Sequence, residues 1–218
     1  MTRWAISLTT LSLIFSSCNQ GTQDSSSTLL ESPVLSRPIV ALVPVIERAR
    51  TDLKWSVSQE LSHAIRQRLT QKNHLYLMSE EAVASMAKRA MSAHDPFGLD
   101  TSWVKKAFPQ NEFVAFMELL EHREVSLYPT AETQDSPAEL NLTVRVRVFD
   151  TREQTPKVVL QEIVQQSHHI PRPFNKANFN QVPWGDEAFE ISPLGIAHEA
   201  LTKEIVSRIE DYILITGH

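Results

Sequence analysis

Cysteine and glycine are both scarce in this chain of 218 residues. Cys18 is the only cysteine, so no disulfide can form within one molecule and packing must hold the folded part together. The chain contains five glycines, and none of them forms a Gly-rich loop of the kind that cradles phosphates or dinucleotides. These two scarcities argue against a disulfide scaffold and against a nucleotide-binding enzyme.

Recognisable catalytic and metal-binding motifs are absent as well. His198 and Glu199 begin a zinc-protease pattern, but Thr202 stands where its second histidine would be. His168 and His169 are adjacent in an expected strand, where neighbouring side chains point to opposite faces. We therefore expect no enzyme activity, no metal and no cofactor. The net charge of -5 argues against nucleic acid as a partner.

An export signal is predicted over residues 1–17. Arg3 precedes an apolar run of about a dozen residues, which is shorter than the roughly 20 that a membrane-spanning helix needs. Two serines then lead to Cys18, which resembles the processed cysteine of bacterial lipoproteins, although Phe15 stands where that pattern usually has leucine. We predict that Cys18 is lipidated. The alternatives are an ordinary cleaved signal and an uncleaved anchor.

Residues 18–37 are expected to form a flexible tether, because serine, threonine and glutamine dominate their first half. About 19 such residues have an average reach of about 25 Å, so the following domain would stay near the membrane that holds Cys18. Asn19 replaces the aspartate that retains lipoproteins in the inner membrane, and this resemblance favours the periplasmic face of the outer membrane. The inner membrane and the cell surface are the alternatives. The expected partners are membrane lipid, through the acyl chains, and envelope proteins.

Residues 38–216 predict a single α/β (α+β) domain with the element order β-α-β-α-(α)-β-β-β-α. We expect a two-layer sandwich, in which three to four helices pack on one face of a mixed sheet of about five strands. Pro44 should mark a strand end or a bulge, and Asp52 is the expected N-cap of the first helix. The expected strands are Pro38–Ile46, His74–Met78, Glu112–Leu120, Leu140–Phe149 and Lys157–Ser167. The expected helices are Leu53–Lys72, a helix capped by Ser79, Thr101–Phe108, and a helix from Ser192-Pro193 to about Ile215.

The long loop Pro171–Glu190 is the first candidate for docking a partner. Loops of this length without structure of their own are often functional, and aromatic side chains are enriched at interfaces. Phe174, Phe179 and Trp184 are the candidate contacts. The alternative is that these rings fold back over the core.

The strand Leu140–Phe149 supplies the second candidate surface. Its residues alternate between apolar and more polar, which is typical of an antiparallel strand with one face on the core. Arg145 and Arg147 are expected on the outward face. Solvated charge is the default interpretation, and an acidic partner is the alternative.

A strand V-A-L-V-P, a long helix, and a late hairpin with V-R-V-R-V-F-D-T and K-V-V follow one another between Pro38 and Ile215. In this order the chain resembles the periplasmic α/β domain shared by CsgG-like curli-secretion lipoproteins, LpoB-like activators of penicillin-binding proteins and the TolB N-terminal domain. The residues that carry the resemblance are Val40–Val45, Phe113–Leu119, Val144–Asp150 and Val158–Leu160. No stretch is left for the long membrane strands of a pore, and the tether is shorter than that of the activators. The resemblance therefore implies an anchored domain that binds proteins.

The sequence thus predicts a membrane-anchored envelope lipoprotein that acts as a protein-binding scaffold or regulator without enzyme activity. The residues leave two alternatives open. A carrier of lipid or a small ligand would show an apolar cavity. An envelope hydrolase with an unrecognised site would show a cleft with two coupled titratable groups.

Overall fold

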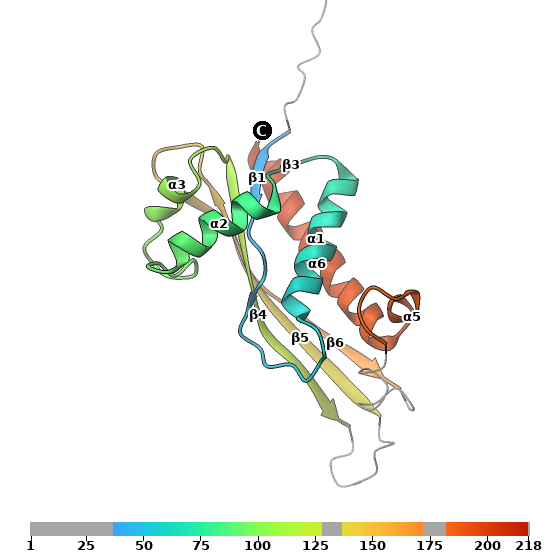
Figure 1. The fold of residues 1–218 in the computed structure, drawn as a ribbon. Helices are drawn as coiled ribbons and strands as arrows, with labels where there is room; N and C mark the ends of the chain where they lie inside the picture. The colour runs from blue at the N-terminus through green and yellow to red at the C-terminus, as the bar shows by residue number, and fades with distance from the viewer. Residues whose placement is uncertain (1–36, 128–136, 172–181, 218) are drawn as a thin grey trace, which may run out of the picture. The chain divides into compact units, whose positions relative to one another are not determined.

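The computed structural model describes residues 37–127, 137–171 and 182–217. The chain divides into two compact units, residues 1–35 and 36–218, and all of the described residues belong to the second unit. Figure 1 shows the helices and strands of this second unit. Cys18, most of the expected tether, Phe174 and Phe179 lie outside the described residues.

The described residues form a six-stranded mixed sheet accompanied by five helices, which confirms the expected α+β class. The sheet order is β3-β1-β4-β5-β6, with β2 beside β4; β1 runs parallel to β3 and β4, whereas β4, β5 and β6 are antiparallel neighbours. The strands are β1 (Ile39–Leu42), β2 (Ile46–Glu47), β3 (Tyr76–Leu77), β4 (Phe113–Ser126), β5 (Ala138–Asp150) and β6 (Lys157–Ile170). The helices are α1 (Val57–Lys72), α2 (Glu80–Met91), α3 (Trp103–Ala107), α5 (Glu187–Glu190) and α6 (Pro193–Gly217).

β1 and β2 are two pieces of the single strand expected over Pro38–Ile46. Both pair in parallel with β4, and Pro44 lies between them. Proline has no N–H to continue the ladder. The next N–H, that of Val45, donates to Ser62 Oγ of α1 at 2.7 Å. Pro44 therefore marks a strand end, as its missing donor predicts.

α1 begins four residues later than the sequence indicates. Ser56 is its N-cap, and Ser56 Oγ accepts a hydrogen bond from the N–H of Gln59 at 3.3 Å. Leu53 and Trp55 lie before the helix and pack, partly buried, against the core. The N-cap expected at Asp52 is therefore wrong, because packing of these two apolar side chains holds the segment before Ser56 outside the helix.

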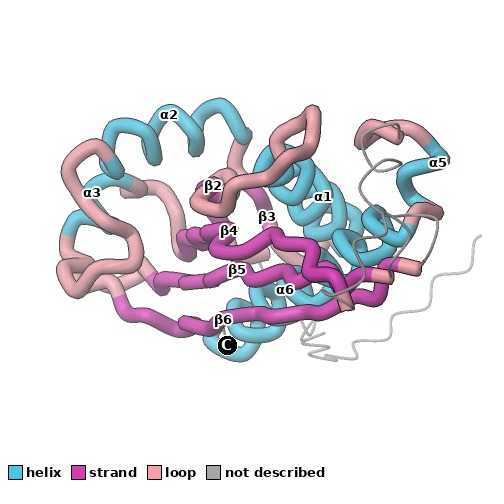
Figure 2. Tube along the Cα trace, turned by 90° about the horizontal axis from the view of Figure 1, so that it is seen from below, coloured by secondary structure: helices cyan, strands magenta, loops and turns pink. Residues whose placement is uncertain are grey.

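Helices lie on both faces of the sheet (Figures 1 and 2). α1 and α6 cover one face and bury the larger hydrophobic core against it. α2 and α3 cover part of the opposite face, where they pack around Phe116 and Phe149. The expected two-layer arrangement therefore describes α1, α6 and the sheet, while α2 and α3 add a third layer at one end.

This third layer changes the environment of the β5 face that the sequence assigns to solvent. Arg147 is only 7% exposed, and its Nη1 donates to the carbonyls of Pro96 and Gly98 at 3.0 and 2.7 Å. The guanidinium of Arg145 lies over the ring of Phe97, 4.1 Å from its centroid. The outward, solvated position expected for Arg147 is wrong, because the loop between α2 and α3 covers it.

α6 is the longest described helix, with 25 residues. Ser192 caps its start: Ser192 Oγ accepts the N–H of Gly195 at 3.0 Å and donates to the carbonyl of Phe189 at 2.7 Å. This confirms the N-cap expected at Ser192. Within the described part of the chain, no helix, α6 included, combines the length and the apolar composition needed to cross a bilayer.

Gly195 allows α5 to approach the first turn of α6, because a Cβ at this position would lie 1.9 Å from the carbonyl oxygen of Phe189. We expect Gly195→Ala to lower the free energy of unfolding by about 1–3 kcal/mol, since backbone atoms would have to move. Chemical denaturation measures the loss. Ile196→Ala, at the neighbouring exposed position, should cost less than about 1 kcal/mol. Equal losses in the two variants would contradict the close approach.

Candidate functional site

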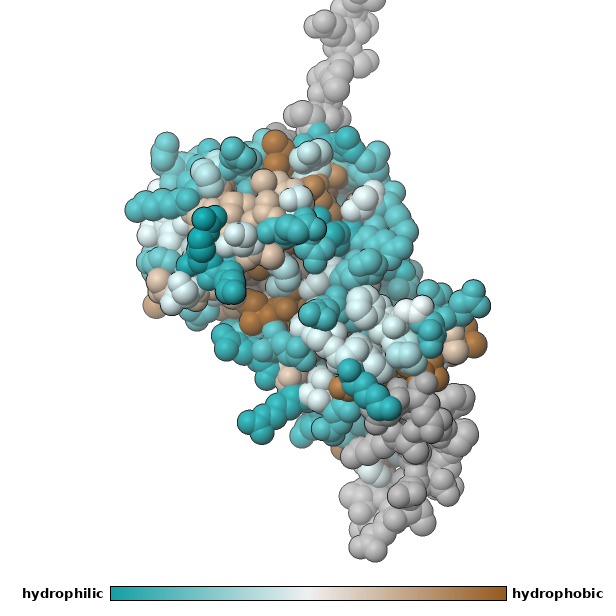
Figure 3. Space-filling view, viewed as in Figure 1, coloured by the Kyte–Doolittle hydropathy of each residue, from teal (hydrophilic) through white to brown (hydrophobic). Residues whose placement is uncertain are grey.

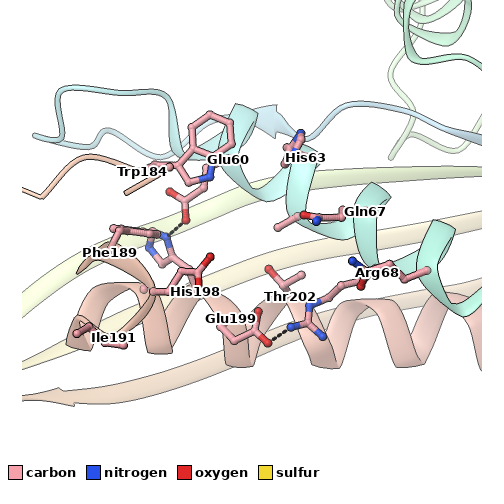
Figure 4. Close-up of a pocket in the computed structure, with 15 residues that line it drawn as sticks. Glu60, His63, Gln67, Arg68, Trp184, Phe189, Ile191, His198, Glu199 and Thr202 are labelled. Carbon is pink, nitrogen blue, oxygen red and sulfur yellow. Dashed lines mark hydrogen bonds and ion pairs between the residues drawn. The ribbon is translucent and has the colours of Figure 1, made fainter. Parts of the chain in front are cut away.

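A pocket of about 520 Å³ lies between α1 and α6, next to the segment that carries α5 (Figure 4). Its volume is within the range of about 300–1,000 Å³ that is usual for ligand sites. Nine of its 15 lining residues carry polar or charged side chains, so the pocket can form hydrogen bonds with what it holds. The lining residues are Glu60, His63, Ala64, Gln67, Arg68, Gln71, Trp184, Gly185, Phe189, Glu190, Ile191, Gly195, His198, Glu199 and Thr202.

A buried chain of hydrogen bonds, here called the Glu60 cluster, adjoins this pocket and consists of Glu60, His198 and His122. Glu60 of α1 and His198 of α6 are 3% and 2% exposed, and Glu60 Oε1 lies 2.7 Å from His198 Nδ1. His198 Nε2 lies 3.0 Å from Nε2 of His122 on β4. Trp55 donates its indole N–H to Glu60 Oε2 at 2.8 Å. Both carboxylate oxygens therefore have partners, and the cluster joins α1, α6 and β4.

Burial lowers the pKa of His122 to about 4, with a smaller contribution from the nearby His198. His122 is therefore neutral at pH 7. Because the two Nε2 atoms are within hydrogen-bond distance, one of them must donate and the other accept. A single proton thus lies between the two rings.

The Glu60 cluster shares a carboxylate–histidine pair with serine hydrolases, but its remaining geometry differs. In a hydrolase the free imidazole nitrogen takes the proton of a nucleophile. Here that nitrogen, His198 Nε2, faces His122 instead. Thr202 lies one turn further along α6, and among the described residues its buried hydroxyl has no hydrogen-bond partner. The cluster therefore links elements of the fold and activates no described nucleophile.

The described residues also contain no group of three or more histidine, cysteine, aspartate or glutamate side chains placed to hold a metal ion. Arg68 of α1 and Glu199 of α6 form an ion pair within the pocket lining, which gives the two helices a second polar link. The charges in the lining are therefore largely engaged with one another.

Trp184 and Ile191 are exposed apolar side chains in the lining of the pocket and are here called its apolar rim. The Trp184 ring lies edge-on to the ring of His63, with centroids 5.7 Å apart. Trp184 is 36% exposed and Ile191 is 80% exposed. Figure 3 shows hydrophobic surface at α5 beside hydrophilic surface. The mouth of the pocket therefore offers two exposed apolar side chains among exposed polar ones such as Gln67 and Glu190.

The structure places the predicted docking residues in different locations. Trp184 lines the pocket, whereas Arg145 and Arg147 lie on the sheet face opposite α1 and α6. Phe174 and Phe179 lie outside the described residues. The sequence analysis missed the Glu60 cluster, because its closest pair is separated by 138 positions and no local motif joins it. His198 was a local signal as half of an incomplete zinc motif, and His122 lay in a run of charged residues that the sequence assigns to a solvated strand end.

A model of a family of unknown function, DUF7499, matches residues 29–217. The chain belongs to this family. Among solved structures, the hypothetical protein CT253 from Chlamydia trachomatis is similar over 82% of this chain and 98% of its own, with 27% sequence identity and a TM-score of 0.65. No curated protein matches the chain.

Structures with lower similarity scores, some of them of lipoproteins, also match the chain. Lipoprotein GNA1162 from Neisseria meningitidis matches 78% of this chain and 99% of its own, at 12% identity and a TM-score of 0.40. The LpoB C-terminal domain from Salmonella enterica matches 62% of this chain and 86% of its own, at 8% identity and a TM-score of 0.37. Likenesses at these scores carry no conclusion about function.

The lowered pKa of His122 predicts a loss of stability in acid. The unfolded side chain binds a proton below about pH 6.5, whereas the folded one does so only below about pH 4. Between these values the unfolded state holds more protons, so the free energy of unfolding falls as the pH falls. Chemical denaturation between pH 7 and pH 4 should show a loss of up to about 3 kcal/mol from this group.

The matched variant is His122→Gln, which keeps a hydrogen-bonding side chain but does not titrate. It should lose less stability than the wild type over the same pH interval. Parallel pH profiles for the two proteins would show that His122 takes up its proton equally in the folded and unfolded states, and would contradict the prediction.

Proposed function

We propose that this protein is a lipid-anchored lipoprotein of the cell envelope, and that its folded unit binds a partner protein at the pocket between α1 and α6. The lipid anchor is inferred from the order in which features follow one another in about the first 40 residues. An export signal leads to the chain's single cysteine, a polar tether follows, and the first described strand begins at Ile39. Asn19 after the cysteine supports the outer membrane, with the folded unit in the periplasm.

The rim of the pocket supports protein binding. Trp184 and Ile191 are exposed apolar side chains beside a polar interior, and aromatic anchors with polar neighbours are typical of the centres of protein interfaces. Trp184 was a docking candidate from the sequence as well. A side chain of the partner could bury its apolar part against this rim and place a polar end in the pocket.

The two other functions fit the geometry less well. An acyl chain needs an apolar cavity, but most of this lining is polar or charged, which disfavours a lipid carrier. A hydrolase needs a nucleophile beside its histidine, but His198 Nε2 faces a second imidazole. A binding role without catalysis therefore has the best support.

Lipidation can be tested by metabolic labelling with a palmitate analogue. The wild-type chain should incorporate the label, and Cys18→Ala should lose it almost completely, because the variant has no thiol to accept an acyl chain. The variant should also leave the membrane fraction, since stable anchoring requires buried acyl chains. Equal labelling of both proteins would refute the anchor.

Docking can be tested by placing a photo-crosslinking amino acid at Ile191 in cells. We expect a crosslinked adduct with one envelope protein, and at least about a tenfold loss of that adduct when Trp184→Ala removes the aromatic anchor. The matched control carries the crosslinker at Leu99, which is fully exposed in the loop between α2 and α3. The same adduct from both positions, or an adduct that survives Trp184→Ala, would refute docking at this pocket.

A further inference from the structure

Among the described strands, β6 lies at an edge of the sheet and leaves its outer side unpaired. It spans 14 residues, and its inner edge pairs with β5 along almost the whole length. Among the described residues no strand pairs with its other edge, and Figure 2 shows β6 as the outermost of the long strands. The N–H and C=O groups on that side are thus available to another extended chain.

β6 also lacks most of the features that usually prevent edge-to-edge pairing. Its register with β5 shifts only near its start, at Val159. Proteins protect edge strands with prolines, with charged side chains or by keeping the strand short. β6 contains no proline, and its only permanently charged side chains are Lys157 at its start and Glu162. Glu162 is already engaged: Tyr212 donates to it at 3.2 Å, and Arg208 lies 3.6 Å away. The outer edge is therefore long and nearly uncharged.

The side chains of β6 on the sheet face opposite α6 suit pairing with a second copy of the chain. Gln161, Ile163 and Gln165 lie on this face; all three are exposed, and Ile163 is 58% exposed. An antiparallel pairing with a two-fold axis at Ile163 would place Gln161 opposite Gln165 of the second copy. Apolar and amide groups would then meet without any like-charge contact.

The charges on α6, the helix next to β6, also favour pairing of β6 with a second copy of the chain. α6 packs along β6, so two-fold pairing of the strands would bring the α6 helices of both copies close together. The exposed or half-buried charged side chains over residues 203–211 of α6 carry both signs. They are Lys203, Glu204, Arg208 and Asp211. A surface of mixed sign can meet its own copy without net repulsion, whereas a surface of one sign cannot. The side chains of β6 and the charges of α6 are therefore both compatible with the same surfaces of a second copy.

We propose that the outer edge of β6 is a self-association site, where two copies of this chain join their sheets by antiparallel β6 pairing. The resulting contact is isologous, because the same strand serves on both copies. It does not depend on the pocket or on the partner protein proposed for it. The two proposals can therefore fail separately.

Two differently tagged full-length copies, expressed together and extracted in detergent, provide the test. The wild-type copies should co-purify. The double substitution Gln161→Lys and Gln165→Lys in both copies should reduce co-purification roughly tenfold, because antiparallel pairing brings the introduced lysines opposite one another. Gln59→Lys, at an exposed position on α1, is the matched control and should leave co-purification unchanged.

Charge reversal separates lost pairing from lost folding. A copy with Gln161→Lys and Gln165→Lys should co-purify again with a copy that carries Gln161→Glu and Gln165→Glu, since opposite charges then meet across the two strands. The proposal is overturned if wild-type copies do not co-purify, if the lysine variant associates as well as the wild type, or if the mixed pair is not restored.

Discussion

The carboxylate of Glu60 is the interaction on which the arrangement of the helical face depends. It is buried between α1 and α6, and it accepts hydrogen bonds from Trp55 and from the imidazole of His198. A buried charge is costly unless it is fully paired, and removing one partner of such a pair typically costs about 3–5 kcal/mol. Arrangements of α1 and α6 that separate Glu60 from His198 are therefore higher in free energy, and the pair favours the observed one. The pocket exists in the space that this spacing leaves.

Two further buried glutamates act in the same way at other places in the fold. Glu118 on β4 accepts from Arg48 after β2 and from Arg145 on β5, at 2.8 and 3.0 Å. Glu210 on α6 pairs with Lys72 and His74 at the end of α1. Each carboxylate joins segments that are distant in the sequence. With a single cysteine in the chain, no disulfide can make such a link within one molecule.

Local patterns were sufficient to predict most of the strands and helices, because alternation, capping residues and proline act over a few residues. The alternation in β5 predicts correctly that Val144 and Val146 face the core. It misplaces Arg147, whose cover comes from the loop between α2 and α3, about 50 positions earlier in the chain. The Glu60 cluster could not be predicted for the same reason, because its residues are far apart in the sequence. Trp184 could be predicted as a candidate, since an aromatic residue in a long loop is itself a local signal.

The pocket and the β6 edge both depend on α6, but on different turns of it. His198, Glu199 and Thr202 line the pocket, whereas Arg208 and Tyr212 contact Glu162 of β6 two turns later. The two surfaces therefore use separate side chains of one helix, and a substitution at one surface leaves the contacts of the other in place.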